Sequence, residues 1–129
     1  MHLNKEKMEI LNLEQFHLKL QEVGRNNVLI SDKVKVKIEK NIGLSIEEVL
    51  DKLYDFNSHV IAAKYVGGDY RIICELSSKF HLVIILFIND NIRIATAIKS
   101  NKNVKKLLKK SKIIYTIVKK TQTDTSFNA

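Results

Sequence analysis

The sequence predicts an α+β protein in which N-terminal helices pack on one face of a four- to five-stranded antiparallel meander. Apolar residues recur with the helical period of about 3.6 up to residue 59, and from Val60 onward they alternate with the strand period of about 2. Short turn signals divide this second part into strands that follow one another directly. Helices followed by such a meander are typical of the α+β class.

The chain of 129 residues has the size of one domain, and a composition of 45% apolar and 28% charged residues excludes wholesale disorder. We expect the domain over residues 1–120 and a disordered polar tail over residues 121–129. The longest apolar run, Leu82–Ile88, is far shorter than the ~20 residues of a membrane-spanning helix. Because the charged start, Met1–Glu9, lacks the apolar region of a signal peptide, we expect a cytoplasmic protein.

Two helices in the first half have clear sequence signals. Lys5–Val23 carries an apolar stripe at helical spacing, and Gly24 follows where a C-terminal cap belongs. A second helix begins at Ser45–Glu48, which has the capping-box pattern of a serine followed three residues later by a glutamate. Its apolar face consists of Ile46, Val49, Leu50, Leu53 and Tyr54.

The stretch Ser31–Asn41 fits both a helix and a strand. Three apolar residues alternate with lysines there, as in a strand. However, Ser31 is a suitable helix N-cap, and Val34 and Ile38 are separated by one helical turn. We favour the helix and leave the strand as the alternative.

Four strands separated by turn residues are predicted in the second half. They are Val60–Val66, Tyr70–Leu76, Phe80–Ile88 and Ile92–Lys99. The hairpin signal Gly67-Gly68-Asp69 joins the first two, and the almost wholly apolar Phe80–Ile88 indicates a strand covered on both faces. A short amphipathic helix is predicted over Asn101–Lys110, and Ile113–Val118 is a candidate fifth strand.

The net charge of +8 is confined to the last quarter of the chain. Residues 1–98 carry 13 basic and 13 acidic side chains, whereas residues 99–129 carry nine lysines and a single acid, Asp124. A neutral body with a cationic end indicates an anionic partner more clearly than the same charge spread evenly would.

Strand alternation connects this charge to the predicted sheet. In the second and fourth strands apolar residues occupy even positions, whereas Arg71, Arg93 and Lys99 occupy odd positions. If the register permits, these three share one face, whose floor is shallow because two alanines separate the basic residues of the fourth strand. The lysines that would extend this face are Lys102, Lys105, Lys106, Lys109 and Lys110.

Such a face suits the phosphates of RNA, because neutralising them releases counterions in a manner largely independent of base sequence. The alternative is a solvated lysine surface that only keeps the protein soluble.

RNA cleavage without a metal needs a base, an acid and cations that stabilise the phosphorane. Histidine suits the first two roles, and arginine or lysine suits the third. The candidate catalytic set is therefore Arg71, Arg93, Lys99 and His81, although a structural role for His81, as for His59, is the interpretation that we favour. None of the four histidines has metal-ligand spacing and Cys74 is alone, so we expect no metal and no other cofactor.

Between Asn41 and Lys110, the order of elements resembles the RelE/BrnT-type ribonuclease toxins of toxin–antitoxin modules. Asn41–Asp55 (NIGLSIEEVLDKLYD) resembles their capped helix, and Asn91–Lys102 (NIRIATAIKSNK) resembles their final strand and the basic run after it. The intervening stretch is similar to their hairpin and central strand. Ile98 stands where the family usually has a second arginine, and an unrelated helix replaces the family's N-terminal Trp-Asp segment.

This resemblance implies a RelE/BrnT-like fold and metal-independent cleavage of messenger RNA. It also implies that Arg71, Arg93 and Lys99 match basic residues of the family's site, and that a small acidic antitoxin protein covers the basic face. The first functional hypothesis is therefore an endoribonuclease toxin. The second is a non-catalytic nucleic-acid-binding protein, and the third is an interaction module whose lysines contact an acidic protein partner.

Overall fold

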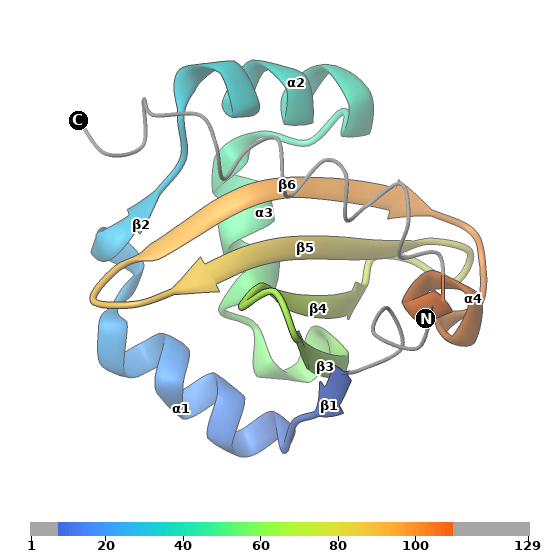
Figure 1. The fold of residues 1–129 in the computed structure, drawn as a ribbon. Coiled ribbons are helices and arrows are strands. Elements are labelled where there is room, and N and C mark those ends of the chain that lie inside the picture. Colours follow the sequence, from blue (N-terminus) through green and yellow to red (C-terminus); the bar gives the residue numbers. More distant parts are fainter. Residues whose placement is uncertain (1–7, 110–129) are drawn as a thin grey trace.

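The computed structural model describes residues 8–109, which form a six-stranded sheet with helices on both faces (Figure 1). The strands are β1 (Met8–Ile10), β2 (Val28–Leu29), β3 (His59–Tyr65), β4 (Tyr70–Glu75), β5 (His81–Ile88) and β6 (Ile92–Ser100). The helices are α1 (Leu13–Val23), α2 (Asp32–Ile42), α3 (Ile46–Leu53) and α4 (Val104–Lys109), and 3₁₀ turns occupy Arg25–Asn27 and Phe56–Ser58.

The predicted antiparallel meander is confirmed as β3–β4–β5–β6, at the centre of a mixed sheet with the order β1-β3-β4-β5-β6-β2. The two outer strands are short and were not predicted. β1 pairs antiparallel with β3, and β2 pairs parallel with β6. The α+β class is therefore confirmed, whereas the candidate fifth strand Ile113–Val118 and the tail over residues 121–129 lie outside the described residues.

The continuous helix predicted over Lys5–Val23 is wrong at its start. Met8–Ile10 pairs with β3, and the helix begins only at Leu13 because the Asn12 side chain accepts a hydrogen bond from the Gln15 amide at 3.0 Å. Gly24 ends the helix as expected, since its N–H donates to the Leu20 carbonyl.

The helix favoured over Ser31–Asn41 is confirmed as α2. The Ser31 hydroxyl accepts from the Val34 amide at 3.2 Å, and Val34, Ile38 and Ile42 are buried at helical spacing. Gly43 then adopts φ +81°, a backbone conformation in which glycine avoids steric cost.

The capping box predicted at the start of α3 is also confirmed. The Ser45 hydroxyl accepts from the Glu48 amide at 3.1 Å, and the Glu48 carboxylate accepts from the Ser45 amide at 2.9 Å.

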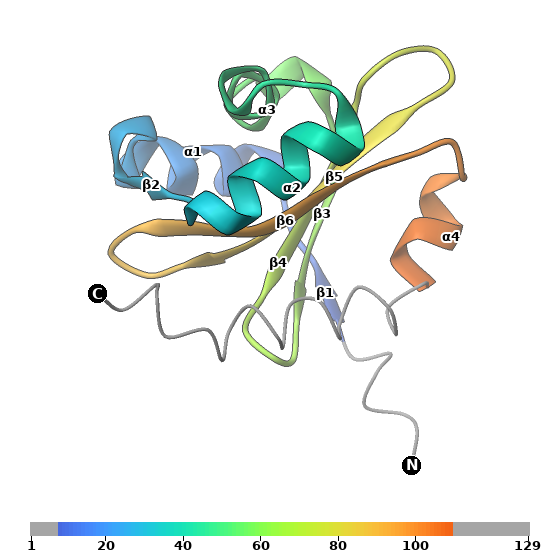
Figure 2. The ribbon, with the colours of Figure 1, turned by 90° about the horizontal axis from the view of Figure 1, so that it is seen from above.

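The sheet separates two apolar cores (Figure 2). Helices α1, α2 and α3 cover one face with the larger core, whereas α4 packs against the opposite face through Leu107. The prediction that β5 is covered on both faces is confirmed, because every side chain from Leu82 to Phe87 is buried. Among residues 8–109, no helix has the length and apolar character that crossing a bilayer requires.

Candidate nucleic-acid interface

A β-bulge in β6 changes which face its basic residues occupy. Ile85 pairs with Thr96 whereas Leu86 pairs with Ile94, so Ala95 is an additional residue in β6. An extra residue reverses the alternation of side chains beyond it. The bulge therefore separates Arg93 and Lys99 onto opposite faces of the sheet.

Lys99 lies on the face of the sheet that α1, α2 and α3 cover. Its Cα partner is Leu82 of the larger core, and its ammonium lies 4.6 Å from the centroid of the Phe80 ring. The prediction that Arg71, Arg93 and Lys99 share one face is therefore wrong, because strand alternation was extrapolated through an irregular strand.

Arg93 lies on the α4 face of the sheet, but at its other end. It pairs with Phe87, with its guanidinium carbon 5.3 Å from the ring centroid, and it lines a small pocket beside the Asn89–Asn91 turn. Lys99 lies six positions after Arg93 in β6, which corresponds to roughly 20 Å along the strand. These two residues therefore do not converge on one phosphate.

Arg71 is buried beneath α4 rather than exposed on a basic surface. Only 1% of the residue is accessible, and its face of the sheet is lined by Ile73, Val83 and Ile85. Alternation places Arg71 on the correct face of β4, opposite Ile72 and Cys74, but α4 covers that face, so the expected exposed basic surface is absent at Arg71.

The buried guanidinium caps the C-terminal end of α4. Arg71 Nη1 donates to the Leu107 carbonyl at 3.0 Å and to the Leu108 carbonyl at 3.4 Å. A cation there interacts favourably with the partial negative charge of the carbonyl groups in this turn of the helix. Burial lowers the pKa of Arg71, and the neighbouring Tyr65 and Asp69 oppose that shift. Arg71 therefore positions α4.

Tyr65 and Asp69 complete this polar cluster and were not anticipated. The Arg71 guanidinium carbon lies 4.2 Å from the Tyr65 ring centroid, and the Tyr65 hydroxyl donates to the Leu108 carbonyl at 3.4 Å. Asp69 is 2% exposed, and burial raises the pKa of its carboxyl. The sequence predicts Asp69 only as the last residue of the Gly67-Gly68-Asp69 hairpin turn, which gives no sign of its burial.

Fixed in this way, α4 directs lysines to solvent. Leu107 is buried against the sheet, whereas Lys105 and Lys106 are exposed, and Lys102 is exposed just before the helix. The Asn103 side chain starts the helix by accepting from the Lys106 amide at 2.9 Å. We call the exposed side chains of Lys102, Lys105 and Lys106 the α4 lysine surface. The Lys109 side chain and Lys110, predicted to extend it, lie outside the description.

Lys105 and Lys106 carry uncompensated charge within the described part of the chain. No carboxylate of residues 8–109 lies within ion-pair distance of either ammonium. By contrast, Arg25 is held by Glu47 at 2.9 Å and by Asp51 at 2.8 Å. Among the described residues, the ammonium groups of Lys105 and Lys106 are thus exposed and not paired with a carboxylate.

His59 and His81 have different surroundings. His59 is buried, its Nε2 lies 2.8 Å from the Leu53 carbonyl, and burial lowers the pKa of its imidazole. His81 is half-buried on the face that α4 covers, opposite Ser100 of β6 and Glu75 of β4. His81 and Lys99 both lie at the end of the sheet from which the chain enters α4, but on opposite faces of the sheet.

Within residues 8–109, no three His, Cys, Asp or Glu side chains gather as a metal site would require. Comparison of the chain with protein-family models, with curated proteins and with solved structures finds no match.

Proposed function

We propose that the protein binds RNA through the α4 lysine surface without cleaving it. The observation that carries the proposal is the contact between Arg71 and the C-terminal carbonyls of α4. A buried arginine holds a six-residue helix against the sheet, and the helix presents its lysines outward. The hydrogen bonds from Arg71 and the burial of Leu107 hold the described part of α4, and with it the backbone of Lys105 and Lys106, against the sheet.

The charge distribution supports the same proposal. The residues that follow β6 carry nearly all of the excess positive charge, and α4 is the element that anchors this part of the chain to the domain. Lysine ammonium groups contact phosphates without reading bases, so the binding we propose depends weakly on base sequence. RNA is preferred over DNA in the proposal only because Asn41–Lys110 resembles RNA-cleaving proteins.

Cleavage is the second candidate, and one observation favours it. His81 lies opposite Ser100, whose hydroxyl accepts from the Lys102 amide at 3.1 Å, so an imidazole lies near the start of the α4 lysine surface. In this version the protein is a metal-independent endoribonuclease toxin, His81 transfers the proton and a small acidic antitoxin covers the lysines. It ranks second because Arg71, Arg93 and Lys99 do not converge on His81.

The test is fluorescence anisotropy of labelled single-stranded RNA with the full chain, in EDTA and at low salt. We expect saturable binding that weakens by about tenfold in the double variant Lys105→Gln/Lys106→Gln. The matched control is Lys37→Gln/Lys40→Gln on α2, which removes the same charge from exposed positions on the opposite side of the sheet.

Gel analysis of the same RNA separates the two candidates. Intact RNA after incubation supports binding alone, whereas cleavage that persists in EDTA and is lost in His81→Gln supports the endoribonuclease. Absence of RNA binding at low salt contradicts both and favours the interaction module for an acidic protein partner.

A further inference from the structure

We propose that a cavity between α1, β1 and β3 binds a small organic phosphate through Lys19, Lys64 and the hydroxyl of Tyr70. The cavity has a volume of about 350 Å³, which lies within the range of small-molecule sites. It lies on the face of the sheet that α1, α2 and α3 cover, because Tyr70 belongs to the larger core. The site is therefore separate from the α4 lysine surface on the opposite face and independent of the RNA proposal.

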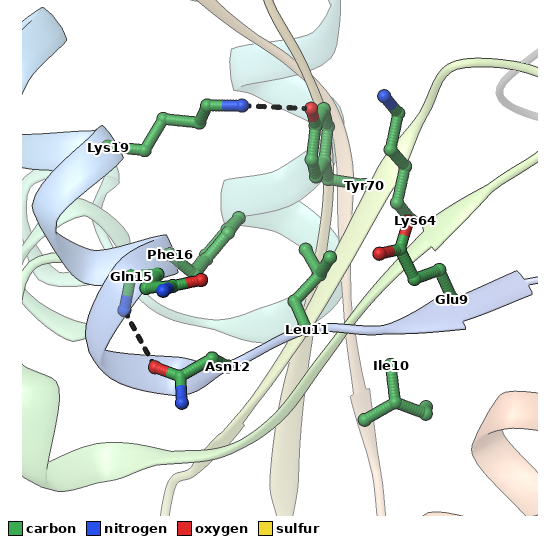
Figure 3. A pocket seen from close by; sticks show the side chains of 9 residues that line it. All are labelled: Glu9, Ile10, Leu11, Asn12, Gln15, Phe16, Lys19, Lys64 and Tyr70. Atoms are coloured by element: carbon green, nitrogen blue, oxygen red, sulfur yellow. Dashed lines mark hydrogen bonds between the residues drawn. The ribbon is translucent and has the colours of Figure 1, made fainter.

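Two ammonium groups converge on one phenol ring (Figure 3). Lys19 of α1 and Lys64 of β3 approach Tyr70 from opposite sides, and each Nζ lies 5.5 Å from the centroid of the ring. Lys19 Nζ also donates to the Tyr70 hydroxyl at 3.4 Å. Three hydrogen-bond donors of this kind define the polar end of the cavity.

Neither ammonium is neutralised by the described protein. No carboxylate in residues 8–109 lies within ion-pair distance of Lys19 or Lys64, although both side chains approach the same ring. Because both ammonium groups flank the same ring, an anion bound at the Tyr70 hydroxyl would be attracted by both. A dianion would be attracted more strongly than a monoanion.

A phosphate monoester matches these donors. It carries about −1.5 to −2 charges near pH 7 and three acceptor oxygens, which suffice for two lysines and one phenol hydroxyl. The rest of the cavity is partly apolar, with Leu11 and Phe16 below the ring of Tyr70 (Figure 3). An organic group attached to the phosphate would bury its apolar surface there, which free phosphate cannot do.

The carboxylate of Glu9 is expected to weaken the binding of a phosphate in this cavity. Among the described residues Glu9 is the one acidic side chain that lines the cavity, and it faces Lys64 directly across the β1–β3 pair. Its carboxylate competes with a bound phosphate for the Lys64 ammonium and repels the ligand's negative charge. Glu9→Gln is therefore expected to tighten binding, while loss of either lysine weakens it.

The test is an NMR titration of the full chain with phenyl phosphate, following the backbone amides around the cavity. We expect saturable shifts at Phe16 and Tyr70. Affinity should fall by about tenfold in Lys19→Gln and in Lys64→Gln, since each loses a charge-assisted hydrogen bond. Lys79→Gln, in the turn at the opposite end of β4, is the matched control and should bind as the native chain does.

One further variant tests the Tyr70 hydroxyl, and two further ligands test which chemical group the cavity binds. Tyr70→Phe keeps the buried ring, so it tests the hydroxyl without a large change in packing, and it should weaken binding by a smaller factor. Inorganic phosphate and benzoate should both bind more weakly than phenyl phosphate, because one lacks the apolar group and the other lacks the second charge.

The proposal is overturned if phenyl phosphate gives no saturable shifts at the cavity, or if Lys79→Gln weakens binding as much as Lys19→Gln does. Equal affinity for benzoate overturns the assignment of a phosphate, and equal affinity for inorganic phosphate overturns the assignment of an organic ester. Unchanged affinity in Glu9→Gln contradicts the competition at Lys64.

Discussion

Arg71 Nη1 donates a hydrogen bond of 3.0 Å to the carbonyl oxygen of Leu107, which lies 36 residues later in the chain. The guanidinium is buried and the acceptor is at the C-terminal end of α4, so one contact joins the middle of the sheet to the helix that carries the exposed lysines. The packing of α4 on the sheet and the exposure of its lysines therefore both depend on Arg71.

Arg71→Gln is expected to lower the free energy of unfolding by about 2–3 kcal/mol, because the helix carbonyls lose a charged donor inside the second core. Urea unfolding measures this loss. Lys37→Gln on α2 is the control, since it removes one positive charge from an exposed position, and its effect should be smaller. A comparable loss in both variants contradicts the special role of Arg71.

The same substitution should release α4 before the rest of the domain unfolds. Hydrogen exchange of the α4 amides should accelerate in Arg71→Gln, whereas exchange in β5 should follow the global stability. Unchanged exchange in α4 contradicts the capping role. RNA affinity should also fall in this variant, although Arg71 itself does not reach the ligand.

Leu107→Ala is expected to cost about 2–4 kcal/mol of unfolding free energy. Leu107 is 4% exposed and is the only fully buried side chain that α4 contributes to the second core among the described residues. Truncation leaves a cavity that neighbouring strands fill poorly. Leu18→Ala on α1 is the control, because Leu18 is 62% exposed and its truncation should change stability by less than about 0.5 kcal/mol.

His59 makes stability depend on pH. Burial lowers the pKa of its imidazole below the ordinary value of 6.5, so the unfolded chain binds a proton more readily than the folded chain. The contribution of neutral His59 is present above about pH 6.5 and is lost as the pH falls through that value towards the folded pKa.

Urea unfolding between about pH 8 and 5 checks this prediction. The native chain should lose more stability on acidification than His59→Gln, which cannot titrate but whose longer amide keeps a donor at about the position of Nε2 for the Leu53 carbonyl. Parallel pH profiles for the two chains contradict the assignment to His59.

The local signals in the sequence were sufficient for most of the fold. Ser31 and Ser45 start α2 and α3 by accepting main-chain hydrogen bonds over three residues, and Gly24 ends α1, so these boundaries depend on neighbours in sequence. The meander was predictable for the same reason, since short turns force consecutive strands to pair. By contrast, β1 and β2 are two or three residues long and exist only because distant strands offer a free edge.

The candidate site was predicted less well, because it depends on long-range geometry. Ala95 gives no sign in the sequence that it is an extra residue in β6, yet it places Lys99 on the face opposite Arg93. The burial of Arg71 follows from α4 folding back over the sheet, which alternation within one strand cannot reveal. The lysines of α4 were predictable as exposed because Leu107 and the helical period define the opposite side.

The salt dependence of RNA binding tests the central claim most directly. Each phosphate contact with single-stranded RNA contributes about 0.7 to the slope of log affinity against log salt concentration. We predict that Lys105→Gln/Lys106→Gln reduces the magnitude of the slope by about 1.4, whereas Lys37→Gln/Lys40→Gln leaves it unchanged. An unchanged slope in the α4 variant, or an equal reduction in the α2 control, would contradict binding of RNA through the α4 lysine surface.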